Sequence, residues 1–183
     1  GYKASELHSK SKSEKNFYYF RKCQILFLKG DFTGSLDALE QIDPKTFNRF
    51  NQLQNTLAYC YFGFLNRVFA KQDYNLSDYQ SRLASLTTKN KAQEDLVAEQ
   101  WHIMEALDKI VTHHEVNHYF EGGEPKSHLD KVLRTYYNGL NANNQGDLDR
   151  AKTFFAQIVN ENLRLFVVRE AKKYLSGMED AKK

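Results

Sequence analysis

Apolar residues recur every three or four positions along most of the chain, which is the spacing of one face of an α-helix. Runs of β-branched residues with the two-residue alternation of a strand are scarce, so we expect no sheet. Helices are predicted at about residues 13–29, after Asp31, at 44–71, after Ser77, at 90–120, after Ser127, after Asp147 and at 162–175. The pattern therefore predicts an all-α fold of about eight helices.

Polar breaks with recognisable capping residues separate these helices. Asp43-Pro44 combines a capping carboxylate with a proline suited to the first helical position, so we expect the third helix to begin there. Ser77 is predicted to cap the fourth helix in a capping box with Gln80. Residues 121–125, with two glycines and a proline, form the clearest break in the chain.

Two stretches of the chain repeat one arrangement of small residues around a glycine-aspartate turn. The corresponding pairs are Cys23 with Gly139, Gly30 with Gly146, Asp31 with Asp147, and Ser35 with Ala151. In each stretch we expect two antiparallel helices that cross closely at the small residues. The glycine is predicted to take a left-handed conformation, and the aspartate is predicted to cap the second helix.

This repeated arrangement resembles the tetratricopeptide repeat (TPR) family over about residues 17–44 and 133–160. The resemblance implies a right-handed α-solenoid of antiparallel helix pairs, in which stacked neighbours bury the apolar faces. The separation of the two turns is not a whole multiple of the family period of roughly 34 residues, so intervening repeats would be lengthened or degenerate. A compact helical bundle is the alternative architecture.

Both ends of the chain are polar, and the part between them is long enough for one core. We expect a polar linker or tag remnant at residues 1–13, a single helical domain at 14–177 and a loose tail at 178–183.

Asparagines recur on one side of the third and sixth predicted helices. They are Asn48, Asn51 and Asn55 on the third helix, and Asn138 and Asn141 on the sixth. An amide side chain can pair with both the C=O and the N–H of a peptide backbone. TPR-like peptide receptors use helix-borne asparagines in this way, so the resemblance implies that these five side chains face a shared, partly exposed groove. A solvated helix face is the alternative.

Residues 114–118 read His-Glu-Val-Asn-His and match the zinc-peptidase motif HExxH. On a helix, His114 and His118 would lie on one face and could share a zinc ion, with Glu115 as general base. No spacing dictates a third ligand, and both histidines continue an apolar stripe, so we expect packed or helix-terminal histidines. We therefore predict no catalytic residue, no metal and no cofactor, with a zinc-dependent hydrolase as the alternative.

Charge and composition exclude several other classes of function. The net charge of +3 is small and its lysines and arginines are scattered, which argues against a nucleic-acid surface. No apolar run reaches the ~18–20 residues of a membrane span. Cys23 and Cys60 lie among apolar helical residues and are expected in the core, where a disulfide would require the first and third helices to bring them together.

These features predict a non-enzymatic scaffold that binds a peptide or a segment of a protein partner. Self-association through exposed helix faces, which would give a homo-oligomer, is a further alternative.

Overall fold

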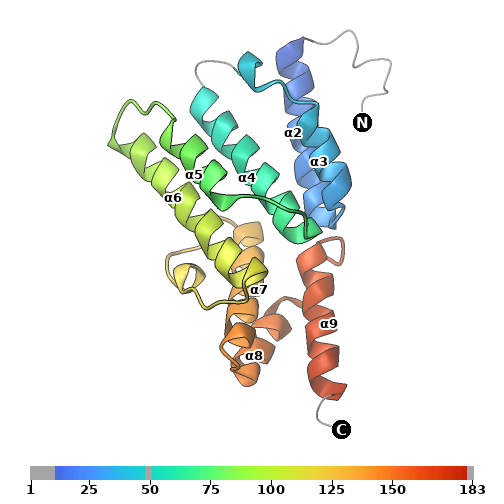
Figure 1. The fold of residues 1–183 in the computed structure, drawn as a ribbon. Coiled ribbons are helices and arrows are strands. Elements are labelled where there is room, and N and C mark those ends of the chain that lie inside the picture. The colour runs from blue at the N-terminus through green and yellow to red at the C-terminus, as the bar shows by residue number, and fades with distance from the viewer. Residues whose placement is uncertain (1–10, 48–50, 181–183) are drawn as a thin grey trace. The chain divides into compact units, whose positions relative to one another are not determined.

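The computed structural model describes residues 11–47 and 51–180, and this part of the chain is helical without any strand. The prediction of an all-α fold with eight α-helices is confirmed. The helices are α2 Lys12–Lys29, α3 Phe32–Glu40, α4 Gln52–Ala70, α5 Leu76–Ala84, α6 Lys91–Leu107, α7 His128–Asn144, α8 Leu148–Ile158 and α9 Phe166–Asp180 (Figure 1). None of these described helices is long and apolar enough to cross a membrane.

The helices divide into two compact units according to their contacts. The first unit contains the residues up to Phe27 together with Asp31–Trp101. The second contains the residues from His102 onward together with Leu28–Gly30. The solenoid arrangement and the single domain expected from the sequence stay predictions.

The first unit has its core where α2, α3 and α4 meet. Cys23 and Leu39 are buried there, and half-buried aromatic residues such as Tyr59 pack against them. The close helix crossing predicted at the small residues Cys23 and Ser35 is present, because the Ser35 hydroxyl donates to the Cys23 carbonyl oxygen at 2.8 Å. Cys23 and Cys60 are free, buried thiols, and burial raises the pKa of both.

The second unit is built on the antiparallel pair α7 and α8, with α9 packed against α8 (Figure 1). Gly139 lies directly beneath the ring of Phe155, and Ala151 is completely buried. The Phe155 ring then stacks on Tyr174 of α9, with their ring centroids 4.8 Å apart. The small residue at 139 therefore permits a close approach of α7 and α8, and an aromatic side chain fills the space.

The two glycine-aspartate turns have the same local geometry. Gly30 and Gly146 both take positive φ angles, 81° and 77°. The Asp31 side chain accepts a hydrogen bond from the Gly34 N–H at 2.9 Å, and the Asp147 side chain accepts one from the Arg150 N–H at 3.1 Å. Both predicted turns and both predicted N-caps are thus confirmed. Such a local repeat can be recognised in the sequence because the residue types of its glycine and aspartate favour the positive φ angle and the N-cap.

Two predicted helix starts were wrong. Asp43 does cap a helical turn, but this turn is the short 3₁₀ element Pro44–Thr46, and α4 begins only at Gln52. The cap of α5 is Asn75, whose side chain accepts from the Ser77 N–H at 3.1 Å, rather than Ser77 itself. Asparagine and serine are comparable N-caps, so the pattern of polar residues alone did not decide between them.

Two predicted helix ends were also wrong. The predicted helix at 90–120 stops at Leu107 and is followed by a π-helical turn, Asp108–Thr112. The last helix continues to Asp180, so residues 178–180 are helical rather than part of a loose tail. The predicted linker at 1–13 overlaps the start of α2 by two residues, and its first ten residues lie outside the described part of the chain.

Candidate functional site

Three asparagines of α7 hold a stretch of the chain's own backbone. The Asn141 Oδ1 atom accepts from the Asn117 N–H at 2.9 Å. The Asn138 Nδ2 atom donates to the Phe120 carbonyl at 3.1 Å, and the Asn144 Nδ2 atom donates to the Ile110 carbonyl at 2.9 Å. The three residues follow one another at intervals of three, so their side chains share one face of α7. We call residues 113–122, which cross this face, the strap.

A carboxylate secures the end of the strap. The Glu121 Oε1 atom accepts from Asn141 Nδ2 and lies 3.3 Å from both His118 Nδ1 and Arg150 Nη2. Burial opposes ionisation of Glu121, but the hydrogen bonds and positive charges of His118 and Arg150 prevail and hold the pKa of its carboxyl below the ordinary value. The Arg134 Nη1 atom also donates to the Gly122 carbonyl at 2.7 Å.

The α7 amides therefore differ from the expected groove residues in their exposure. Asn141 is fully buried, so the expectation that every predicted amide is partly exposed was wrong for this residue. Asn138 is half-buried. Both amides bind an irregular backbone, as their chemistry suggests, but this backbone belongs to the strap.

The amides predicted on the third helix lie in the first unit. Asn51 is the exposed N-cap residue of α4 and makes no side-chain capping bond, and Asn55 is half-buried in the first turn. Asn48 lies outside the described residues. A groove shared by the amides of the two units stays a prediction.

The HExxH match is not on a helix. His114 has a φ angle of 55° and stands in the non-helical stretch between the π turn and the 3₁₀ turn Tyr119–Glu121. The helical premise that placed His114 and His118 on one face was therefore wrong. Within the described residues, no group of three or more His, Cys, Asp or Glu side chains is placed to hold a metal ion.

The helix predicted at 90–120 ends before the HExxH match because the chain there has no apolar face to bury. From Thr112 to His118 the only aliphatic side chain is Val116, and it is 42% exposed. A continued helix would have little to bury here, whereas the irregular backbone gains the α7 amides as partners. The end of the apolar stripe at Val111 was the available sequence signal.

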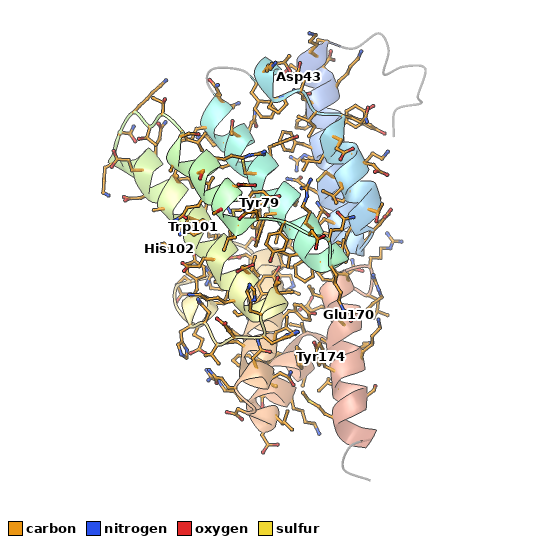
Figure 2. All side chains as sticks on the ribbon, in the orientation of Figure 1. Asp43, Tyr79, Trp101, His102, Glu170 and Tyr174 are labelled. Atoms are coloured by element: carbon orange, nitrogen blue, oxygen red, sulfur yellow. The ribbon has the colours of Figure 1, made fainter. Side chains whose placement is uncertain are left out.

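A groove between α8 and α9 was not predicted from the sequence. It has a volume of about 570 Å³. Its lining includes Leu148, Lys152, Lys173, Tyr174, Gly177 and Met178. Figure 2 labels Glu170 and Tyr174 on the α9 side. Leu148 and Gly177 are too weak a signal to predict this groove from the sequence, because an exposed leucine and a helical glycine each occur in many helices without any function.

Comparison of the chain with protein-family models, curated proteins and solved structures gave no match.

Proposed function

We propose that the chain is a non-enzymatic, TPR-like scaffold that binds a short segment of a protein partner in the groove between α8 and α9. The observation that carries this proposal is the groove itself, which combines an apolar floor with charged walls. A pocket of this kind provides apolar contact area for affinity and a few polar groups for orientation.

The floor of the groove offers apolar surface and open space to an apolar side chain of a ligand. Leu148 is 54% exposed at the mouth of the groove. Tyr174 is held in place by stacking on Phe155, so its ring is a rigid surface that loses little conformational freedom on binding. A Cβ atom added at Gly177 would meet no atom within 4 Å, so there is open space above this position.

The walls of the groove carry charges of both signs. Asp149 and Lys152 line it from α8, and Glu170 and Lys173 line it from α9. The Lys173 Nζ atom lies 2.7 Å from a Glu170 carboxylate oxygen in an exposed pair. A segment with one apolar anchor between an acidic and a basic residue would complement this arrangement, and the charges would fix its direction and register.

Asn138 and Asn141 do not enter this proposal, because they already hold the strap. A contribution from Asn51 and Asn55 of the first unit to a second peptide site remains part of the proposal inherited from the TPR resemblance. It rests on the chemistry of the amide group.

The test is a selection of random peptides displayed on phage against the purified chain, followed by fluorescence polarisation with the enriched peptides. The blocking variant is Gly177→Phe, whose ring would occupy the open space in the groove. Gly177→Ala is the matched control, because it changes helix propensity in the same direction without filling the groove.

We expect enriched peptides with one apolar anchor to bind the chain and Gly177→Ala alike, and to lose at least about tenfold in affinity for Gly177→Phe, since the anchor side chain would be displaced. Thermal melts should show both variants folded. Equal binding to Gly177→Phe would remove the groove as the site, and a selection without enrichment would count against the scaffold function.

A further inference from the structure

A small polar pocket lies in the first unit, between the C-terminal half of α4 and the helix α5. It has a volume of about 220 Å³. The pocket is lined by Arg67, Tyr74, Asn75, Asp78, Tyr79 and Arg82. Its position is marked by Tyr79 in Figure 2.

Arg67 is fixed at one wall of this pocket. Its Nη1 atom donates to the Gly63 carbonyl at 2.9 Å and to the Tyr79 hydroxyl oxygen at 3.2 Å. A guanidinium group can only donate, so the Tyr79 oxygen is the acceptor in this bond. The hydroxyl hydrogen of Tyr79 therefore remains available to donate to a ligand.

The ring of Tyr79 is also held in position. It packs edge-on against Phe64, with ring centroids 5.6 Å apart, and Phe64 makes a similar contact with Tyr74 at 5.4 Å. Burial raises the pKa of Tyr79, and the charges of Arg67 and Arg82 oppose this rise. The hydroxyl thus stays protonated at neutral pH, with two guanidinium groups near it.

Arg82 supplies the second guanidinium. It is exposed, and its side chain makes no hydrogen bond or ion pair within the part of the chain that the structure describes. The only carboxylate in the lining is Asp78, which accepts from Asn75 Nδ2 at 3.4 Å. The lining therefore carries two positive side chains and one negative side chain, which leaves one uncompensated positive charge in the pocket.

We propose that this pocket binds a carboxylate group, with Arg67, Arg82 and the Tyr79 hydroxyl as its donors. Arginine matches the geometry of a carboxylate with paired N–H donors. A single excess positive charge suits a monoanion, whereas Asp78 would repel the second charge of a phosphate dianion. The proposal is independent of the groove between α8 and α9.

The pocket is smaller than the ~300–1,000 Å³ typical of sites for drug-sized ligands. It can therefore hold either a small free acid or the C-terminal end of a peptide, and both present the same group to Arg67 and Arg82. A small free acid and a peptide C-terminus are distinguished by comparing the affinities of ligands that carry the same carboxylate on molecules of different size.

The experiment is a titration of the isotope-labelled full chain, followed by two-dimensional NMR at constant ionic strength. The probes are sodium acetate, glycine, acetylated trialanine with a free carboxylate, the same tripeptide as its amide, and sodium phosphate. We expect saturable shifts of the Asn75–Arg82 amides and of the Arg67 side-chain N–H with the carboxylates, and none with the peptide amide.

Arg82→Gln should weaken carboxylate binding by about tenfold or more, because a charge-assisted hydrogen bond is lost. Tyr79→Phe should weaken it roughly threefold to tenfold while keeping the packed ring. Arg164→Gln, an exposed arginine of the second unit, is the control and should leave binding unchanged.

Tighter binding of the tripeptide acid than of acetate and glycine would assign the pocket to a peptide end, and the opposite order would assign it to a small free acid. The absence of saturable shifts, tighter binding of phosphate than of every carboxylate, or equal loss in Arg164→Gln would each overturn the proposal. Melting curves of all variants serve as the control that distinguishes a loss of binding from a loss of folding.

Discussion

The close approach of α7 and α8 depends on the missing side chain of Gly139. A Cβ atom at this position would lie 2.5 Å from Cε1 and 2.8 Å from Cδ1 of Phe155, which is too close for an ordinary contact. Phe155 is itself fully buried and stacked on Tyr174, so it has little room to move away.

We therefore expect Gly139→Ala and Gly139→Leu to lower the free energy of unfolding by about 1–3 kcal/mol, the usual cost of overpacking a core. Urea denaturation followed by circular dichroism measures the change. Gly177→Ala is the matched control, because its added methyl group meets no atom within 4 Å and should stabilise α9 by about 0.5–1 kcal/mol. An unchanged midpoint in both Gly139 variants would refute the close crossing.

Glu121 gives the strap a dependence on pH. Its pKa is lowered in the folded chain, so the ionised carboxylate stabilises the fold above its ordinary pKa of ~4.3. This contribution is lost as the pH falls through the lower, folded-state pKa. We expect Glu121→Gln to be slightly less stable than the unsubstituted chain at neutral pH and to lose less stability on acidification.

Urea midpoints measured between neutral and acidic pH test this expectation. Glu124→Gln is the control, since Glu124 is an exposed carboxylate close by in sequence. Parallel pH profiles for Glu121→Gln and the unsubstituted chain would contradict the role of Glu121.

Residue-level predictions from the sequence succeeded where the partner is close along the chain. Gly30 and Asp31 form their turn with neighbours a few positions away, and their residue types largely dictate it. The partners of Asn138 and Asn144 lie 18 and 34 positions away. Their amide chemistry was evident in the sequence, but the identity of the backbone that they bind depends on the tertiary fold.

At the level of elements, the backbone of the strap is held chiefly by hydrogen bonds with asparagine side chains of α7. Replacing Asn141 with alanine would leave the Asn117 N–H without its acceptor and remove a donor from Glu121. We expect Asn141→Ala to cost about 1–3 kcal/mol, the penalty for an unpaired buried polar group, and to loosen the strap.

Amide hydrogen exchange provides the measurement. Exchange of the Asn117 N–H should become faster by roughly tenfold or more in Asn141→Ala, because each 1.4 kcal/mol of local opening corresponds to a factor of ten. Asn160→Ala, at an exposed position after α8, should leave this exchange rate unchanged. Equal protection of Asn117 in Asn141→Ala would show that other contacts hold the strap.

The strap also shows why the predicted helix at 90–120 was too long. The apolar spacing up to Val111 is helical, and the chain does remain helical to Thr112. Beyond that point the sequence contains no glycine or proline until Gly122, so no helix-breaking residue marks the end of the helix. The end is set by the absence of apolar residues to bury and by the amides of α7, and the second of these causes is not local.

For the whole molecule, the sequence predicted the all-helical class and both hairpins, but it did not predict the division into two units. The repeated turns lie one in each half of the chain and specify only their own surroundings. The long middle region has no such turn. The division there follows from contacts within each unit between residues far apart in the sequence, which no local pattern reveals. Helix α6 crosses the division, since Trp101 belongs to the first unit and His102 to the second. Helix α2 crosses it as well, because its last two residues, Leu28 and Lys29, belong to the second unit. Figure 2 labels Trp101 and His102 on α6.

A continuous helix across the division should couple the folding of the two units, because unfolding of either one would fray α6 into the other. We expect a single cooperative thermal transition. His102→Pro should break this coupling: proline removes a helical hydrogen bond and clashes with the preceding turn, at a cost of about 3 kcal/mol or more. The side chain of His102 is 59% exposed, so little packing is lost with it.

Differential scanning calorimetry distinguishes the outcomes. His102→Pro should unfold in two transitions, and the additional Gly139→Ala substitution should move only the transition of the second unit. His102→Ala, which removes the same side chain but keeps the helix, should retain one transition at nearly the original temperature. Two transitions in the unsubstituted chain would show that the units are not coupled, and one transition in His102→Pro would show that their coupling does not depend on α6. Coupling would support the single domain predicted from the sequence, because the two units would then unfold as one body.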